Sequence, residues 1–470
     1  MSVVFFDSVQ VNFFKYLGIS LKTLSKITKK GNGTSLPGLV VEKYYPKLIK
    51  LLAKNYKNII LITGTNGKTT TRGIICHLLK NNSYKVCTNQ GGANILRGII
   101  TTLLNNLDYK NQPKSDYLVL EVEEATMPIL TKFLKPDQII LTNIFRDQMD
   151  AYGEINQTLD YFDVAITNSL AQNSDLKILA NGDDTKLSNY LNQKRYAKLI
   201  NYFGVESNNQ INNQIQFESA EETHAINPNQ IIKAKLISNN GINISFQSSN
   251  NSSDSSNSNH FDSPQLSETR LNLSGLYNLY NAWSAILATK NLLTKTQIQT
   301  TLPSFGAIFG RGEVINIDDK TITLFLVKNP AGFDQILQTL NYLDNANSNN
   351  GLIISINDNI ADGRDVSWLW DVEFEKYFDS LNANFNQIIT SGTRGLDMLL
   401  RLEIDHFKNL TVENNYKNNS QNLLSEIMKS NSSTPPIANW TICATYTAML
   451  EIRSELAKIT PLKNIDNEDY

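Results

Sequence analysis

The chain has 470 residues, enough for about two or three domains that each bury a hydrophobic core. Hydrophobic residues make up 41% of it and the formal net charge is -2. This balance is typical of a soluble globular protein and lacks the strongly basic face that nucleic-acid binding usually needs. Because Cys76, Cys87 and Cys443 lie far apart in apolar segments and the four histidines are equally scattered, we expect a reduced cytoplasmic protein without structural zinc.

Residues 1–56 are predicted to form a helical lead-in, interrupted by the turn "GNGTSLPG" at 31–38. The first 24 residues are apolar but are broken every few positions by Asp, Gln, Asn or Lys. They have no basic start and no cleavage-site pattern, so we expect neither a signal peptide nor a transmembrane segment. Packing against the protein core is the favoured role of this segment.

From 57 to about 200, short apolar runs alternate with longer amphipathic stretches. Four of the runs look like strands that end in polar or small residues, namely 58–63, 116–122, 138–144 and 176–184. Alternating strands and helices predict an α/β fold with a parallel sheet covered by helices. Ligands of such sheets bind at the carboxyl ends of the strands. We expect this central domain to cover 57–316.

Residues 206–268 differ in composition, because they are rich in Asn and Ser and poor in large apolar side chains. The runs 230–238 and 241–246 could form a small hairpin, whereas 247–264 is expected to be disordered. An amphipathic helix is predicted within 271–293. After a boundary near 316–322, strands and helices alternate again, so 317–470 is expected to form a second open α/β domain.

A candidate phosphate-binding loop lies at Gly64-Thr65-Asn66-Gly67-Lys68-Thr69, between a predicted buried strand and a predicted helix that continues with Thr70. Glycines let the backbone direct N–H groups at phosphate oxygens, and a helix N-terminus adds its positive dipole end. Lys68 would contact the β- and γ-phosphates and Thr69 would bind Mg²⁺. The usual first glycine is replaced by Ile62. An incidental strand-turn-helix is the alternative, but the flanks match on both sides.

The shortened loop resembles that of the Mur ligases and folylpolyglutamate synthetases. These enzymes use ATP to convert a carboxylate into an acyl phosphate, which an amine then attacks. Further segments resemble motifs of the same family in the same order. The residues that match these motifs are Glu121 and Glu124, Asn143 with Asp147 and Asp150, Asn181 with Asp184, Asn278 with Asn281, and Arg311 with Glu313.

The resemblance implies that Glu121 binds Mg²⁺ and that Asn143, Asn181, Asp184, Asn278 and Arg311 contribute to the ATP site. Taken singly, Asp147 or Asp150 would more often be a solvated helix-cap acid than a metal ligand. Glu121 has the stronger case, because a carboxylate at the end of a parallel strand lies over the ligand crevice.

Three departures argue against an ordinary amino-acid ligase of this superfamily. Gln148 and Tyr277 replace two usual histidines, and 160–170 lacks the lysine that many Mur ligases carry in carbamylated form. The C-terminal segments 326–337, 354–375, 390–402 and 445–453 instead resemble the MurT family, the Mur-ligase-like subunits of lipid II isoglutaminyl synthases. Many members carry a four-cysteine zinc ribbon, but 206–268 has no cysteine, so zinc is not expected.

This resemblance implies ATP-dependent amidation of the D-glutamate α-carboxylate of lipid II, at the inner face of the membrane. Lys68 and Mg²⁺ would stabilise charge on the transferring phosphoryl group. None of the cysteines has a setting suited to glutamine hydrolysis, which needs a thiol held against a histidine. Ammonia would therefore come from a partner, a GatD-type class I glutaminase that docks on the C-terminal domain.

In this family an aspartate of the C-terminal domain completes the catalytic triad of the partner. The candidates are Asp358, Asp362 and Asp365, of which Asp365 is favoured and Asp362 comes second. The alternative role of each is to cap a turn or the helix that begins near Ser367.

Two other functions compete with amidation. One is a stand-alone Mur or folylpolyglutamate-type ligase that joins an amino acid to its acceptor. The other is a nucleotide-binding scaffold without activity, against which the intact Lys68, Thr69, Glu121, Asn143 and Arg311 argue.

Overall fold

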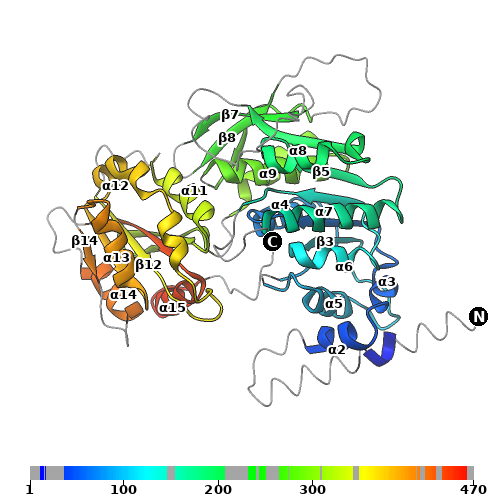
Figure 1. Ribbon diagram of the computed structural model, residues 1–470, viewed down its shortest axis with the longest axis horizontal. Coiled ribbons are helices and arrows are strands. Elements are labelled where there is room, and N and C mark those ends of the chain that lie inside the picture. The colour runs from blue at the N-terminus through cyan, green and yellow to red at the C-terminus, as the bar shows by residue number, and fades with distance from the viewer. Residues whose placement is uncertain are drawn as a thin grey trace, which may run out of the picture.

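The computed structural model describes residues 11–14, 16, 36–90, 92–145, 154–206, 231–239, 243–249, 264–273, 275–306, 310–341, 349–408, 410–412, 419–429 and 437–462. Two sheets, each with helices packed against it, make up the molecule (Figure 1). The predicted α/β class with a mainly parallel sheet in each domain is confirmed.

The described N-terminal residues are helical, as predicted. α2 (Leu36–Tyr44) and α3 (Leu48–Ala53) pack beside α5 (Leu96–Asn105), and the backbone N–H of Gly38 donates to Thr101 Oγ1 (3.0 Å). The expected turn at 31–38 lies partly outside the described residues, and its last three residues already belong to α2.

The first sheet has nine strands in the order β2-β3-β1-β4-β5-β6-β7-β8-β9. The strands from β2 to β7 in this order are parallel, and β8 and β9 are antiparallel. Their bounds are β1 Asn58–Thr63, β2 Val86–Thr88, β3 Tyr117–Glu121, β4 Gln138–Leu141, β5 Lys177–Asn181, β6 Ile200–Glu206, β7 Ile231–Asn239, β8 Ile244–Ser248 and β9 Thr269–Leu271.

Helices cover both faces of this sheet, which explains why β1 is apolar at consecutive positions. Leu61 packs on the face that carries α3, α5 and α7 (Glu154–Leu170), whereas Ile60 and Ile62 face α4 (Lys68–Lys80) and α9 (Leu276–Thr289). The remaining helices of this domain are α6 (Met127–Leu130), α8 (Thr185–Asn192) and α10 (Lys295–Thr301). The loop between β1 and α4 therefore opens at the carboxyl edge of the sheet.

The Asn/Ser-rich segment contributes strands to this sheet. β7 and β8 form the predicted hairpin, and β7 also pairs with β6 in parallel. Of the stretch expected to be disordered, Gln247 and Ser248 belong to β8, and 250–263 lies outside the described residues.

The second sheet has six strands in the order β10-β11-β15-β12-β13-β14, parallel except for the β10–β11 hairpin. Their bounds are β10 Arg311–Ile317, β11 Lys320–Leu326, β12 Asn350–Ser355, β13 Gln387–Ser391, β14 Leu410–Val412 and β15 Asn439–Ala444. The helices around it are α11 Pro330–Asn341, α12 Phe378–Asn384, α13 Gly395–Ile404, α14 Asn419–Lys429 and α15 Tyr446–Leu456.

The boundary expected between 316 and 317 is too late, because β10 already pairs with β11 in the second sheet. A buried ion pair fixes β10 there: Arg453 of α15 donates two hydrogen bonds to the Glu313 carboxylate (2.7 and 3.1 Å). The matched "GRGE" motif thus joins the C-terminal domain and carries Arg311 to the side of the first domain.

Candidate active site

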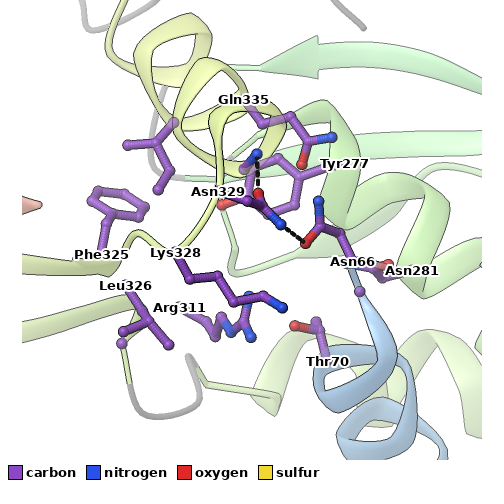
Figure 2. A pocket seen from close by; sticks show the side chains of 14 residues that line it. Asn66, Thr70, Tyr277, Asn281, Arg311, Phe325, Leu326, Lys328, Asn329 and Gln335 are labelled. Atoms are coloured by element: carbon purple, nitrogen blue, oxygen red, sulfur yellow. Dashed lines mark hydrogen bonds between the residues drawn. The ribbon is translucent and has the colours of Figure 1, made fainter. Parts of the chain in front are cut away.

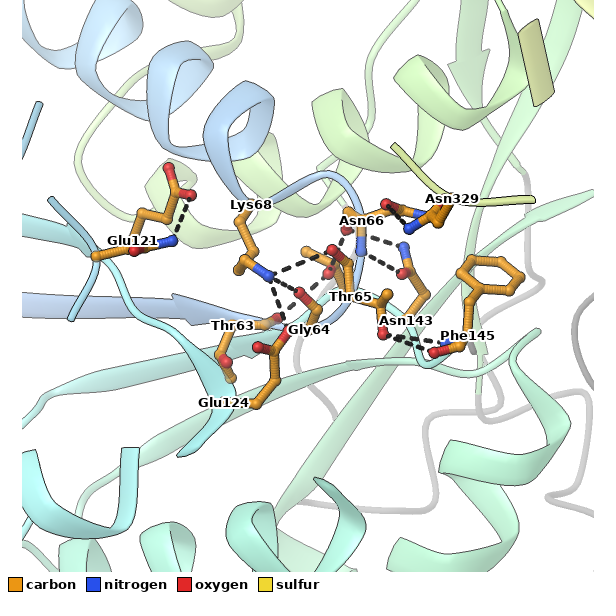
Figure 3. A network of polar contacts seen from close by, with 12 residues as sticks. Thr63, Gly64, Thr65, Asn66, Lys68, Glu121, Glu124, Asn143, Phe145 and Asn329 are labelled. Carbon is orange, nitrogen blue, oxygen red and sulfur yellow. Dashed lines mark hydrogen bonds and ion pairs between the residues drawn. The ribbon is translucent and has the colours of Figure 1, made fainter. Parts of the chain in front are cut away.

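The loop at 64–69 is braced by the residues that follow β4 (Figure 3). Asn143 Oδ1 accepts the backbone N–H of Asn66 (2.9 Å), and Asn143 Nδ2 donates to the Asn66 carbonyl (3.0 Å). Thr142 Oγ1 donates to the same carbonyl (2.7 Å), and Thr65 Oγ1 exchanges hydrogen bonds with the Phe145 backbone. Asn143 therefore holds the loop in its conformation. The sequence indicated only that Asn143 contributes to the nucleotide site, without this structural role.

Gly67 makes the turn into α4 with a positive φ of 87°, a conformation that glycine adopts at little cost. A Cβ atom at this position would lie 2.2 Å from Asn281 Oδ1, so α9 approaches the loop too closely for any side chain. Asn281 Oδ1 also accepts from Thr71 Oγ1 (3.4 Å). The loop is thus fixed between the end of β4 on one side and α9 on the other.

Lys68 is almost fully buried and its ammonium group is surrounded by oxygen atoms (Figure 3). It donates to the carbonyls of Gly64 (2.5 Å) and Thr65 (3.2 Å) and forms an ion pair with Glu124 (2.8 Å). Burial acts to lower the pKa of Lys68, but the nearby carboxylates, with Glu124 foremost, outweigh it and raise that pKa. Lys68, the first residue of α4, is therefore protonated and positively charged.

The Glu121 carboxylate lies at the end of β3, as predicted, and is buried. Arg72 of α4, fully buried, approaches it (3.6 Å), and Asn94 Nδ2 lies 3.5 Å from its other oxygen. Asn89 holds the backbone, since its Oδ1 accepts the Glu121 N–H (3.0 Å) and its Nδ2 donates to the Glu121 carbonyl (2.8 Å).

Glu123 adds a further acid to this edge. Burial and the neighbouring Glu124 carboxylate raise its pKa, while Lys68 and Lys328 act in the opposite direction. Lys328 belongs to the segment that joins β11 to α11, so the C-terminal domain contributes charge to the same edge.

A pocket lies between the two domains next to the loop (Figure 2). Asn66, Gly67 and Thr70 form part of its wall, together with Tyr277 and Asn281 from the start of α9. Burial raises the pKa of Tyr277 to about 12, so its hydroxyl group stays protonated. The opposite wall comes from the C-terminal domain, and its residues are Gly310, Arg311, Phe325, Leu326, Lys328, Asn329, Gly332, Gln335 and Ile336.

The side chain of Asn329, which is fully buried, connects the two walls. Its Nδ2 donates to Asn66 Oδ1 (3.4 Å), and its Oδ1 accepts the N–H of Gly332 in the first turn of α11 (2.8 Å). The side-chain Nδ2 of Asn66 is buried and forms no hydrogen bond. A polar donor without a partner beside a glycine loop fits a site built for a ligand with acceptor atoms.

Three residues predicted to bind nucleotide are used by the protein itself. Asp184 is fully buried, caps α8 through Leu187 N–H (3.0 Å) and accepts Ile144 N–H (2.7 Å). Asn181 Nδ2 donates to the Thr142 carbonyl (3.0 Å). Asn278 is buried behind Asn281 and accepts from its amide (3.2 Å). In this structure the three residues position the loops and Asn281, which lines the pocket, and their part in nucleotide binding stays a prediction.

The other predicted residues divide between two groups. Thr69 lies in the first turn of α4 beside Lys68, and Thr70 lines the pocket with Arg311. The acids Asp147 and Asp150, and Gln148 between them, lie outside the described residues.

Each of the three candidate aspartates of the C-terminal domain accepts hydrogen bonds from within this chain. Asp362 accepts from Thr447 N–H (2.7 Å) and Thr447 Oγ1 (2.5 Å) at the start of α15. Asp358 accepts from Thr393 Oγ1 (2.8 Å). Asp365 accepts Ser367 N–H (2.8 Å) at the start of the 3₁₀ helix η5 (Ser367–Asp371), and these bonds to Ser367 lower the pKa of Asp365. Of the three, only Asp365 is exposed, and the other two are half-buried.

The three cysteines lie in the interior of the fold, where a nucleophile would not reach a substrate from solvent. All three are buried and none forms a disulfide. Burial raises the pKa of Cys87 to about 12 and also raises the pKa of Cys443, so these thiols stay protonated.

The donors at the loop fit a nucleotide with Mg²⁺. Within the described ranges no three His, Cys, Asp or Glu side chains gather into a ready-made metal site. Mg²⁺ prefers few protein carboxylates together with phosphate oxygens, and the Thr69 hydroxyl and Glu121 carboxylate are oxygen ligands of that kind.

No helix in the described part of the chain is both long and apolar enough to cross a membrane.

Sequence reasoning missed Arg72, Glu123, Lys328, Asn329 and Gln335 as parts of the site. The segment "VKNPAGF" was noticed as a family motif, but only the packing of the two domains shows that Lys328 and Asn329 face the loop. Arg72 had no signal of its own, because a lone arginine in an amphipathic helix is usually solvated.

Two family models match the chain. The Mur ligase middle domain covers residues 62–289, and the MurT ligase C-terminal domain covers 326–449. The chain is 30% identical over 406 residues to the lipid II isoglutaminyl synthase (glutamine-hydrolyzing) subunit MurT of Staphylococcus aureus, with 81% of this chain and 86% of that protein covered. It is also 30% identical over 447 residues to the subunit MurT of Streptococcus pneumoniae, with 92% and 94% covered.

Among solved structures, the MurF ligase of Thermotoga maritima in complex with ADP shares the fold, with a TM-score of 0.58 at 15% identity over 88% of this chain and 82% of that one. The likeness to the two MurT proteins is stronger, because both the sequence identity and the share of the chain that is covered are high enough to show the family. The chain belongs to the MurT family, within the Mur ligase superfamily.

Proposed function

We propose that this protein is the ATP-dependent subunit of a lipid II isoglutaminyl synthase, which amidates the D-glutamate α-carboxylate of the stem peptide. The observation that carries the proposal is the interdomain pocket. One wall includes Asn66 and Gly67 of the phosphate loop, which also carries Lys68, and the other wall is the C-terminal domain whose sequence matches the MurT family. The similarity to proteins of that name supports the choice of substrate.

The chemistry follows from the poor reactivity of a carboxylate. Its oxygen attacks the γ-phosphorus of ATP, the β–γ bond breaks and ADP leaves. Ammonia then attacks the acyl phosphate, phosphate leaves with the former carboxylate oxygen, and one proton is released. Lys68 would stabilise charge on the transferring phosphoryl group. Mg²⁺, held by Thr69 and Glu121, would neutralise the phosphate oxygens.

Ammonia would come from a glutaminase partner of the GatD type, because the buried thiols of this chain cannot hydrolyse glutamine. Asp365 is the better candidate to complete the partner's triad. It is exposed and, as its lowered pKa indicates, charged, whereas Asp362 is held by Thr447. The site of action would be the inner face of the membrane, where lipid II is made.

The competing function is a stand-alone ligase that takes an amino acid as nucleophile. It would need an amino-acid pocket and no glutaminase. The direct discriminator is the identity of the nucleophile that enters the product.

The first test is an amidation assay with lipid II, ATP and Mg²⁺. The chain alone should amidate lipid II from ammonium, and it should use glutamine only when a co-purified glutaminase is added. Mass spectrometry of the stem peptide would measure the product. If ammonium gives no amide and a free amino acid is ligated instead, the stand-alone ligase takes the place of the amidating subunit.

The second test concerns Asp365, the favoured candidate for the partner's triad. Asp365→Asn should abolish glutamine-dependent amidation by the complex and leave the ammonium-dependent rate within about twofold of wild type, because a missing triad acid lowers only the partner's rate, by roughly 10⁴-fold. Asp371→Asn, an exposed acid at the other end of η5, is the matched control. If Asp365→Asn lowered the glutamine-dependent and the ammonium-dependent rates equally, the residue would act on folding and not on the partner's triad.

The third test concerns the loop. Gly67→Ala places a Cβ atom against Asn281 and should lower the affinity for MgATP by about tenfold or more, equivalent to at least about 1.4 kcal/mol. Gly92→Ala is the control, because Gly92 also has a positive φ (78°) but no atom lies within 4 Å of the added Cβ. Calorimetric titration would measure both. Comparable losses in the two variants would attribute the effect to backbone strain and not to the contact with α9.

A further inference from the structure

The four most exposed aromatic side chains in the described part of the chain belong to its N-terminal elements and to a turn that contacts them. They are Tyr109 (83% exposed), Tyr44 (68%), Tyr16 (65%) and Phe13 (61%). Single exposed rings are common on protein surfaces, but a group of them on one surface indicates a site of interaction.

Side-chain contacts join these elements into one surface. The contacts are the stacked rings of Phe14 and Tyr45 (centroids 6.1 Å apart) and the hydrogen bonds from Asn111 to Asn12 (2.9 Å) and from Asn55 to Gln112 (2.6 Å). The first two hold the helical residues 11–14 and 16 against the end of α2 and against the turn 108–112. The third holds the end of α3 against the same turn. We call the exposed side of these four elements the N-terminal surface.

A row of exposed lysines lies on the same elements. Lys47, Lys50 and Lys54 recur at helical spacing along the exposed side of α3, and Lys43 lies in the last turn of α2. The opposite side of α3 is buried in the core of the first domain. The N-terminal surface therefore presents both aromatic rings and positive charge.

The overall net charge of -2 conceals an uneven distribution along the chain. Residues 1–57 contain ten lysines and two acids, Asp7 and Glu42, so the rest of the chain carries a net negative charge. The turn and strand entry at 108–116 are balanced, with two lysines and two aspartates. A positive segment in a slightly negative protein is complementary to an anionic partner.

The combination of lysines with exposed aromatic rings favours a lipid surface as that partner. Lysines near a membrane are attracted by anionic headgroups, and tyrosine or phenylalanine rings are stable at the level of the headgroups, where one side of the ring is apolar and the other is wet. A nucleic acid would need the charge alone.

We infer that the N-terminal surface binds the surface of a membrane that contains anionic phospholipids. The lysines contact lipid phosphates, and the rings of Phe13, Tyr16, Tyr44 and Tyr109 insert among the headgroups. In Figure 1, α2 lies at the lower edge of the molecule, apart from the second sheet, and no residue of this surface lines the interdomain pocket. The inference does not rest on the proposed function, because lipid binding requires neither ATP nor lipid II.

The first measurement is sedimentation of the whole chain with vesicles, without ATP and without lipid II. Vesicles of phosphatidylcholine with about 30% phosphatidylglycerol should bind the protein at least about tenfold more tightly than vesicles of phosphatidylcholine alone. Added salt should weaken the binding, because it screens the lysines from the headgroups. Equal affinity for the two kinds of vesicle overturns the inference.

The second measurement locates the binding with two variants that each replace four exposed lysines. The first carries Lys43→Gln, Lys47→Gln, Lys50→Gln and Lys54→Gln, and the control carries Lys198→Gln, Lys295→Gln, Lys408→Gln and Lys458→Gln. The first variant should bind anionic vesicles more than about tenfold less tightly than wild type, because each lysine at such a surface contributes about fivefold. The control should stay within about threefold of wild type. Both should keep the wild-type affinity for MgATP, which shows that the fold is intact. Equal losses in the two variants would assign the effect to net charge and overturn the inference.

The third measurement tests insertion of the rings. Tyr44→Trp adds an indole at the N-terminal surface, and its emission, after subtraction of the four native tryptophans, should be quenched by anionic vesicles with brominated acyl chains. No quenching of the added emission contradicts insertion. If a DNA duplex bound as tightly as the vesicles and lost affinity in the same lysine variant, the surface would be a general polyanion site and not a lipid site. If the chain formed dimers without vesicles and Tyr44→Ser disrupted them, a second copy would be the occupant.

Discussion

The close approach of α9 to Gly67 is the contact on which the site depends. Asn281 occupies the space that a side chain at position 67 would fill, and Asn143 and Thr142 hold the next residue, Asn66, from the opposite side. The loop is therefore shaped by residues from three separate segments and not by its own glycines alone. Rigid N–H groups that need no rearrangement are what stabilisation of a developing phosphate charge requires.

The electrostatic arrangement follows from that placement. Burial would discharge an isolated lysine, but Glu124 and its neighbours keep Lys68 charged. Among the described residues of the loop side, Glu124 pairs with Lys68 and Glu121 lies beside Arg72.

Local patterns predicted the parts of the molecule that local sequence determines. The strand at 58–63, the glycine loop, the helix after it and the hairpin at 231–248 carry their signals in a few consecutive residues, and the structure contains each of them. The ordered series of short motifs also identified the family, which the similarity to MurT proteins confirms.

Tertiary packing decided what the patterns could not. Asp184 and Asn278 have the residue types of ligands, yet the fold buries them against backbone and side-chain partners. The expected domain boundary between 316 and 317 lies after the start of β10. The residues of a hairpin strand do not indicate which of two sheets the strand joins. Asn329 meets Asn66 across more than half of the chain, and a contact of that kind leaves no periodic trace in the sequence.

The most direct test of the account is an isotope experiment on the carboxylate. Lipid II labelled with oxygen-18 in the D-glutamate α-carboxylate is amidated with ATP and ammonium, and the released phosphate is analysed by mass spectrometry. Activation as an acyl phosphate predicts that each phosphate released carries one labelled oxygen from the substrate. Phosphate without the label, accompanied by amide formation, would contradict the mechanism.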